Sequence, residues 1–267
     1  MKEGIIAKSS TCFTILLCIF YWSNIQSATI LIDPGHGGDD YGAMSQWVVE
    51  KSDKYGDRKF KVYEKDLALE IAKLVKKRLA KRYSVFLTRS IDRQISLEER
   101  AAMASKVKAD IFVSIHVNSS KSAQSKGVET YFLDNHDDQA VKKVETVENR
   151  GLQGEELVIR QIIIDLMVNK SEVRSKRLAQ AIHGQVAKRV VKKYKMRDRG
   201  VKGGIFYVLA LTKIPAALLE VGFISNAQET AIIRSGNFQQ EYAAAIVAGI
   251  DSYFMKLKGG DATVPLF

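Results

Sequence analysis

The feature of this sequence that most constrains its fold is an alternation of short apolar runs with longer stretches of helical periodicity. Short apolar runs bounded by Gly, Pro or polar residues are typical of buried strands. Because amphipathic helices separate them, we predict a single α/β domain with a mostly parallel, twisted sheet flanked by helices. The predicted strands are Ile30–Ile32, Ser84–Arg89, Ala109–His116, Gly127–Leu133, Gly203–Leu209 and Ile214–Phe223.

Helices are predicted where apolar residues recur every three or four positions. The first covers Glu64–Leu79, and its acidic start and basic end complement the helix dipole. The others are a helix opened by the capping box Ser96–Glu99, a basic amphipathic helix over Ser175–Tyr194, and a last helix with an apolar stripe from Phe238 to Leu257.

Two of the predicted strands end at a histidine. His36 follows the first strand in a Pro/Gly-rich turn, and His116 ends the third strand. Ligand sites in open α/β sheets lie at the carboxyl ends of the strands, so we expect these imidazoles to share a ligand. His183 lies beside the apolar stripe of a helix and is expected to be packed or exposed instead. The polar segment Asp39–Tyr63 is expected to form a long loop over the site.

Two glutamates are candidates for chemistry with these histidines. Glu220 stands alone in an apolar run, where a carboxylate is costly unless it is paired or functional. Glu64 opens a helix, where an acid also serves to compensate the helix dipole. Two imidazoles, one carboxylate and water form a catalytic zinc site, and a second carboxylate can then act as general base. Spacing alone leaves open which glutamate has which role.

Residues 1–28 have the pattern of a secretory signal peptide. Lys2 and Lys8 precede the apolar run Thr11–Trp22, which is short for a permanent membrane span. The alternative is an uncleaved anchor, which Gln26 favours because a cleavage site has a small residue there. Both cysteines lie in this leader, so the mature chain would have neither disulfides nor thiolate ligands. We therefore expect an exported protein, periplasmic or associated with the cell wall, with His and carboxylate ligands.

The chain is basic, with a formal net charge of +11 that falls to +10 without the leader. A basic exported protein is attracted to polyanions such as the bacterial cell wall. Nucleic acid is not expected as a partner, because the basic residues are spread along helical faces without interleaved aromatic residues. We expect a monomer with no permanent membrane span.

Five sequence blocks carry a resemblance to a known family: Leu31–Gly38, Tyr63–Leu67, Leu87–Arg89, Ser114–Asn118 and Leu219–Asn226. From about residue 28 to 258 the chain resembles the zinc-dependent N-acetylmuramoyl-L-alanine amidases of the cell-separation type. The resemblance implies cleavage of the amide between the muramic acid lactyl group and L-alanine of peptidoglycan. It also implies that His36, Glu64 and His116 bind Zn²⁺ and that Glu220 is catalytic.

The segment Asp134–Arg174 is acidic within a basic chain, with nine acids and six bases. It contains the apolar run Leu157–Met167, and we interpret it as a helical insertion near the active site. Relatives that separate daughter cells bear an insertion at this place, which blocks the zinc site until an activator protein withdraws it. By this resemblance Glu148 is the candidate inhibitory zinc ligand and Glu145 the next candidate. The alternative is that both are solvated loop acids.

Two other functions remain open at this point. One is a zinc endopeptidase that cuts within the peptidoglycan stem peptide, and the other is a wall-binding protein with weak or no activity. Many relatives carry an N-terminal wall-targeting domain, whereas here the catalytic domain, residues 29–258, is expected to follow the leader directly. Residues 259–267 are expected to form a disordered tail.

Overall fold

The computed structural model describes residues 27–51, 56–135, 138–149 and 173–258. Its centre is a six-stranded sheet in the order β4-β1-β5-β8-β6-β7. The predicted α/β fold with a mostly parallel sheet is confirmed. The strands are β1 (Thr29–Pro34), β4 (Ser84–Leu87), β5 (Ile111–Asn118), β6 (Val128–Leu133), β7 (Asp198–Gly204) and β8 (Ala216–Phe223).

The direction of the strands divides the sheet into two parts. β4, β1, β5 and β8 run parallel, while β6 pairs antiparallel with β8 and parallel with β7. The carboxyl ends of β1, β5 and β8 therefore meet at one edge of the sheet. This edge is where the site described below lies.

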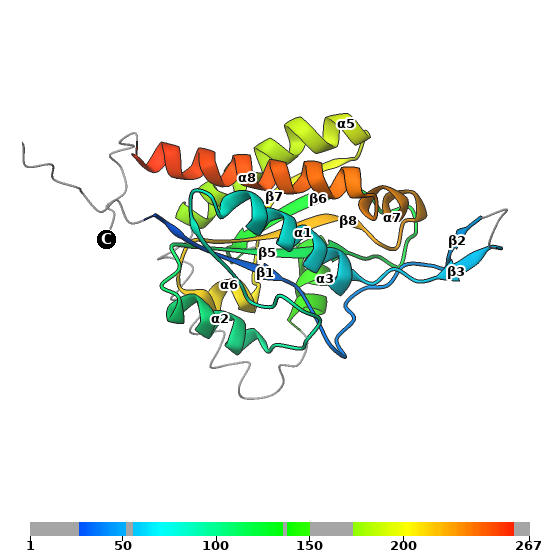
Figure 1. Cartoon of the computed structure of the whole chain (residues 1–267), viewed down its shortest axis with the longest axis horizontal. Helices are drawn as coiled ribbons and strands as arrows, with labels where there is room; N and C mark the ends of the chain where they lie inside the picture. Colours follow the sequence, from blue (N-terminus) through cyan, green and yellow to red (C-terminus); the bar gives the residue numbers. More distant parts are fainter. Residues whose placement is uncertain (1–26, 52–55, 136–137, 150–172, 259–267) are drawn as a thin grey trace, which may run out of the picture.

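Helices cover both faces of the sheet (Figure 1). One face packs against α1 (Glu64–Leu79), α8 (Gly236–Lys258) and the helical residues 173–186, which continue into the π-helical turn η1 (Ala187–Val191) and α5 (Lys192–Tyr194). The other face packs against α2 (Leu97–Lys106), α3 (Gln139–Glu148) and α6 (Tyr207–Thr212). A short helix, α7 (Ala227–Ile233), follows β8.

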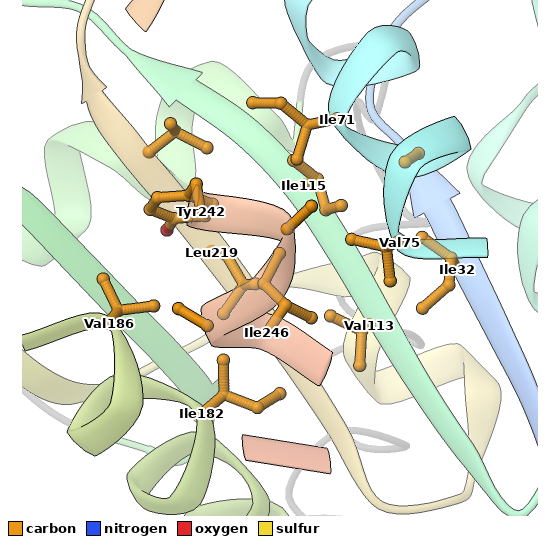
Figure 2. Packing of buried hydrophobic residues seen from close by; sticks show 14 of the residues in the cluster. Ile32, Ile71, Val75, Val113, Ile115, Ile182, Val186, Leu219, Tyr242 and Ile246 are labelled. Atoms are coloured by element: carbon orange, nitrogen blue, oxygen red, sulfur yellow. The ribbon is translucent and has the colours of Figure 1, made fainter. Parts of the chain in front are cut away.

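The two cores follow from the alternation of side chains along the central strands. Ile30 and Ile32 of β1 point into one core, and Leu31 between them points into the other. Figure 2 shows the larger core, where Ile71 and Ile246 from the covering helices meet strand residues. Because both faces are buried, the strands read as continuous apolar runs.

Two of the sequence predictions need correction. The predicted strand Gly203–Leu209 is wrong: β7 ends at Gly204, and Tyr207–Thr212 is the buried helix α6. A short apolar run fits a buried helix as well as a strand, and periodicity does not separate the two. The expected loop Asp39–Tyr63 contains an antiparallel hairpin of β2 (Val48–Glu50) and β3 (Arg58–Phe60).

Several predictions fall outside the described residues. These are the leader, except for its last two residues, the apolar run Leu157–Met167 and the tail 259–267. Within the part of the chain that the structure describes, the helices are too short or too polar to cross a membrane.

Candidate metal centre and active site

The sheet edge brings together the residues that the sequence singled out. His36 follows β1, Glu64 begins α1 and His116 lies near the end of β5. These three residues and Glu148, the last residue of α3, each offer one ligand atom, and the four atoms lie within 4.8 Å of one another. Side chains separated by up to 112 positions in the sequence therefore form one compact group.

His36 is held in a fixed orientation by its own loop. Its backbone is left-handed, with a φ of 57°, and its Nδ1 lies 2.8 Å from Oδ2 of Asp40. A carboxylate on one ring nitrogen directs the other toward a metal. Here that nitrogen, Nε2, is buried, has no hydrogen-bond partner within the described part of the chain, and lies 3.2 Å from Oε1 of Glu64.

The carboxylate of Glu64 is held by backbone amides on both sides. Its Oε2 accepts a hydrogen bond of 2.7 Å from the amide of Ala43, and its Oε1 one of 2.8 Å from the amide of Val117. Gly42 makes this approach feasible, because a Cβ there would lie 2.5 Å from the His36 ring and 2.6 Å from Oε2 of Glu64. Backbone amides therefore hold the carboxylate of Glu64 in place beside the two imidazoles.

The electrostatics of the group favour a cation at its centre. Burial alone would lower the pKa of His36, but Glu64, Asp40 and Glu148 raise it to about 10. Burial opposes the charge on His116 in the same way, and Glu148 and Glu64 raise its pKa well above the usual range. Conversely, the two imidazoles lower the pKa of Glu64 despite its burial. The carboxylates of the group therefore stabilise positive charge at its centre.

The donor set fits a zinc ion. Zinc in proteins prefers four ligands with imidazole nitrogen and carboxylate oxygen among them. The partnerless Nε2 of His36 and the compact group of ligand atoms provide such a site. Gly35 keeps room beside it, because a Cβ at that position would lie 2.4 Å from the His116 ring.

Glu220 lies beside this group without belonging to it. It is in β8, directly opposite His116 in the register of β5 and β8, and its side chain is fully buried. Among the described residues, neither carboxylate oxygen has a hydrogen-bond partner. Burial raises the pKa of Glu220 well above its usual value, and the carboxylates of Glu148 and Glu64 raise it further against the opposing effect of the imidazoles. Such a carboxyl group is suited to hold and transfer a proton.

The structure separates the two candidate inhibitory glutamates. Oε2 of Glu148 lies 2.8 Å from Nδ1 of His116 and 3.5 Å from Nε2 of His36, so it occupies the open side of the group. Glu145 lies elsewhere: its carboxylate accepts a hydrogen bond of 2.5 Å from the amide of Ile205. We therefore retain Glu148 and drop Glu145 as a candidate ligand.

Asn149 fastens the end of α3 beside the site. Its amide nitrogen donates to the carbonyl of Ile205 at 2.7 Å, and its oxygen accepts from the amide of Tyr207 at 2.9 Å. Together with the bond from Ile205 to Glu145, these contacts form a latch between α3 and the start of α6.

A buried ionic network supports the His36 loop, and sequence reasoning did not find it. Asp33 pairs with Arg100 at 2.6 Å and also accepts bonds from the hydroxyls of Thr88 and Ser114. Arg100 donates to the carbonyls of Pro34 and His36, both at 2.8 Å. No signal in the sequence connects Arg100 with a loop 64 positions away. The contact of Asp40 with His36 could have been suspected, because an acid four positions from a candidate zinc-binding histidine is a candidate partner for its other ring nitrogen.

A cavity of about 410 Å³ opens on the site between the start of α2 and the end of α3. Its lining includes His36, His116 and Glu148. His183 is remote from this cavity and packed, as expected: it is buried and lies between Thr130 at 2.9 Å and Asp198 at 2.8 Å.

Comparisons with known proteins agree with this arrangement. A family model described as N-acetylmuramoyl-L-alanine amidase matches residues 30–252. The uncharacterized protein YqiI of Bacillus subtilis is 33% identical over 250 residues, which are 93% of this chain and 96% of YqiI. The N-acetylmuramoyl-L-alanine amidase AmiC of Escherichia coli is 31% identical over 84% of this chain and 52% of AmiC, so the chain spans about half of that relative.

A solved structure resembles this chain in fold as well as in sequence. The N-acetylmuramoyl-L-alanine amidase of Clostridium difficile 630 superposes with a TM-score of 0.61 at 30% identity, over 86% of this chain and 98% of that structure. The family match extends from β1 into α8 and thus includes every residue of the candidate site. The chain therefore belongs to the N-acetylmuramoyl-L-alanine amidase family.

Proposed function

We propose that the protein is an exported, zinc-dependent amidase that cleaves the bond between N-acetylmuramic acid and L-alanine in peptidoglycan. The observation that carries this proposal is the group of His36, Glu64 and His116 beside the buried, partnerless Glu220. The family match over residues 30–252 supports the substrate class. Cell-wall remodelling and daughter-cell separation are the processes in which such cleavage is used.

His36, Glu64 and His116 are the proposed zinc ligands. A bound zinc ion supplies Lewis-acid chemistry, since it polarises a carbonyl group and lowers the pKa of water to about 7. The residues of the chain fix its position: Asp40 orients His36, and the amides of Ala43 and Val117 orient Glu64.

Glu220 is the proposed general base and acid. It takes a proton from the attacking water, whose oxygen forms the new bond to the lactyl carbonyl carbon. It then returns this proton to the amine nitrogen of L-alanine as the carbon–nitrogen bond breaks. The products are a free carboxyl group on the sugar and a free amino group on the peptide. Burial of Glu220 supports this role because it raises the pKa.

Glu148 is proposed to inhibit the enzyme by occupying the position of water and substrate. The distances of 2.8 Å to His116 and 3.5 Å to His36 support this role. Residues 134–174 then act as a regulatory insertion that is withdrawn by a partner protein. Withdrawal also removes the carboxylate of Glu148, which is one of the charges that raise the pKa of Glu220. The pKa of this general base therefore falls when the insertion leaves.

Export is proposed from the pattern of residues 1–28, and peptidoglycan is the proposed macromolecular partner. The net charge of +11 supports attraction to an anionic wall.

A defined substrate tests the activity and its inhibition together. The zinc-loaded protein and its Glu148→Ala variant are incubated with an N-acetylmuramoyl-peptide, and the products are separated by chromatography. We expect faster release of the intact peptide by the variant. Deletion of residues 134–174 is a coarser test, because Val141 in α3 is buried in the core. No release by either protein, with zinc bound, would refute the proposed function.

A further inference from the structure

The hairpin of β2 and β3 projects from the body of the domain (Figure 1). Side chains alternate between the two faces of such a hairpin. On one face, Glu50 pairs with Arg234 from the end of α7, and the guanidinium of Arg234 also lies 5.4 Å from the ring centre of Phe60. Val48 is paired with Phe60 in register. This face therefore packs on the domain.

The opposite face of the hairpin points outward. It carries Trp47, Val49, Lys59 and Lys61, which we call the arm face. Trp47 is 56% exposed and Val49 is 53% exposed. The ammonium groups of Lys59 and Lys61 lie 5.1 Å and 5.4 Å from a ring centre of Trp47. The arm face thus combines an open aromatic ring with two positive charges held close to it.

Exposed apolar side chains are concentrated in this region. Among the described residues, eight large hydrophobic side chains are exposed, and four of them lie between positions 41 and 49: Tyr41, Met44, Trp47 and Val49. Scattered single exposures need no explanation, but a cluster of them indicates an interaction site.

The base of the hairpin is continuous with the wall of the active site. Met44 pairs with Tyr63 through a β-bridge, and the amide of Ser45 donates to the carbonyl of Val62 at 2.9 Å. Two positions earlier, the amide of Ala43 donates to the carboxylate of Glu64 at 2.7 Å. The two strands of the hairpin are therefore joined directly to the segments that hold the carboxylate of Glu64.

We propose that the arm face binds the peptidoglycan strand beyond the unit that is cleaved. A sugar ring stacks on Trp47, and the carboxylates of neighbouring stem peptides lie against Lys59 and Lys61. This inference rests on the proposed function and deepens it, because it assigns a second contact to the same polymeric substrate.

The chemistry of the arm face matches this polymer. A sugar ring presents apolar C–H groups to an aromatic ring, and in peptidoglycan carboxylates lie close to the sugars. On the arm face the indole ring can pack against a sugar ring, and the two ammonium groups beside it can pair with those carboxylates. An anionic bilayer also attracts an indole ring flanked by lysines, so vesicles serve as the competing ligand in the test below. A second contact on the same strand also raises the effective concentration of the scissile bond at the site.

Binding to insoluble peptidoglycan tests the proposal. All proteins are full-length and carry Glu220→Gln, so that the polymer stays intact. We expect W47A and K59A/K61A each to weaken binding by at least roughly fivefold, with the lysine effect reduced by salt. The control K188A/K192A removes two charges from the exposed side of the helix that ends at α5 and should have a smaller effect. Equal effects of control and arm variants would overturn the proposal.

The fluorescence of Trp47 provides a direct readout. The chain has two tryptophans, so W22F leaves Trp47 as the only tryptophan, which is excited selectively at wavelengths where tyrosine does not absorb. In the W22F/E220Q protein, soluble glycan–peptide fragments should shift its emission, whereas vesicles of phosphatidylglycerol should not. An emission shift with the vesicles alone would make the arm face a membrane-binding surface and refute the proposal.

Failure of this proposal is distinguishable from failure of the proposed function. If the wild-type protein cleaves the defined N-acetylmuramoyl-peptide while the arm variants bind peptidoglycan as the control does, only the arm proposal is wrong. If the protein binds through Trp47 but neither the zinc-loaded wild type nor the zinc-loaded Glu148→Ala variant cleaves the substrate, only the proposed function is wrong.

Discussion

Glu220 and the metal ligands differ in one respect at the residue scale. His36, Glu64 and His116 point their ligand atoms at a common centre, whereas both oxygens of Glu220 are buried without a partner. This difference supports the proposed division of roles, with Glu64 as a zinc ligand and Glu220 as the general base.

The first prediction concerns Glu220→Gln. The variant should bind zinc as the wild type does but lose activity by about 100-fold to 10,000-fold, because it removes only the proton-transfer group. Zinc content by atomic spectroscopy and cleavage rate on the same samples check both parts. Loss of zinc from a folded Glu220→Gln protein would show that our division of roles is wrong.

The second prediction concerns the protons that zinc displaces from the two histidines. The pKa of His36 is raised to about 10, and that of His116 is raised well above its usual range. Both are therefore protonated at pH 7 without metal, and zinc requires them neutral. Binding should release about two protons per zinc ion at pH 7. Calorimetry in two buffers of different ionisation enthalpy measures this number, and a value near zero would contradict these pKa shifts.

At the scale of elements, the buried network joins the ends of β1 and β4 to α2. Burial alone would raise the pKa of Asp33, but Arg100, Thr88 and Ser114 lower it. The stabilising effect of this carboxylate is therefore present above its unfolded pKa of about 3.9 and is lost as the pH falls through the lower folded value.

The third prediction is that Asp33→Asn destabilises the fold by about 3–5 kcal/mol at pH 7, because Arg100 is left buried without its partner. Zinc affinity should fall with it, since Arg100 also holds the carbonyl of His36. Urea unfolding of the metal-free protein measures the stability. Glu241→Gln, which breaks the exposed pair with Lys193, is the control and should leave the midpoint unchanged.

The fourth prediction concerns the latch between α3 and α6. Asn149→Ala removes two hydrogen bonds that hold the end of α3, so Glu148 should leave the site more often. Activity should rise by about fivefold or more, as expected for one to two hydrogen bonds of roughly 1 kcal/mol each. Thr146→Ala on the same helix, whose hydroxyl bonds only within α3, is the control. A rise no greater than that of the control would argue against the latch.

At the scale of the whole molecule, the sequence correctly predicted those parts of the fold that depend on a local pattern of apolar residues. The strands β1, β5 and β8 follow from their short apolar runs, and the helices α1 and α8 follow from helical periodicity. The meeting of His36 with His116 follows from the parallel sheet. The assignment of 203–209 failed because its apolar run suits either secondary structure. The contact of Arg100 with His36 was not predictable, because it depends on tertiary packing and leaves no periodic signal.

The identity of the cleaved bond is the central claim, and mass spectrometry of digested peptidoglycan tests it most directly. Purified wall is digested with the zinc-loaded wild type and with Glu148→Ala. We predict intact stem peptides with a free L-alanine amino end, together with glycan free of peptide, in larger amounts from the variant. New amino ends within the stem peptide, with L-alanine still joined to the sugar, would contradict the assignment and make the protein an endopeptidase.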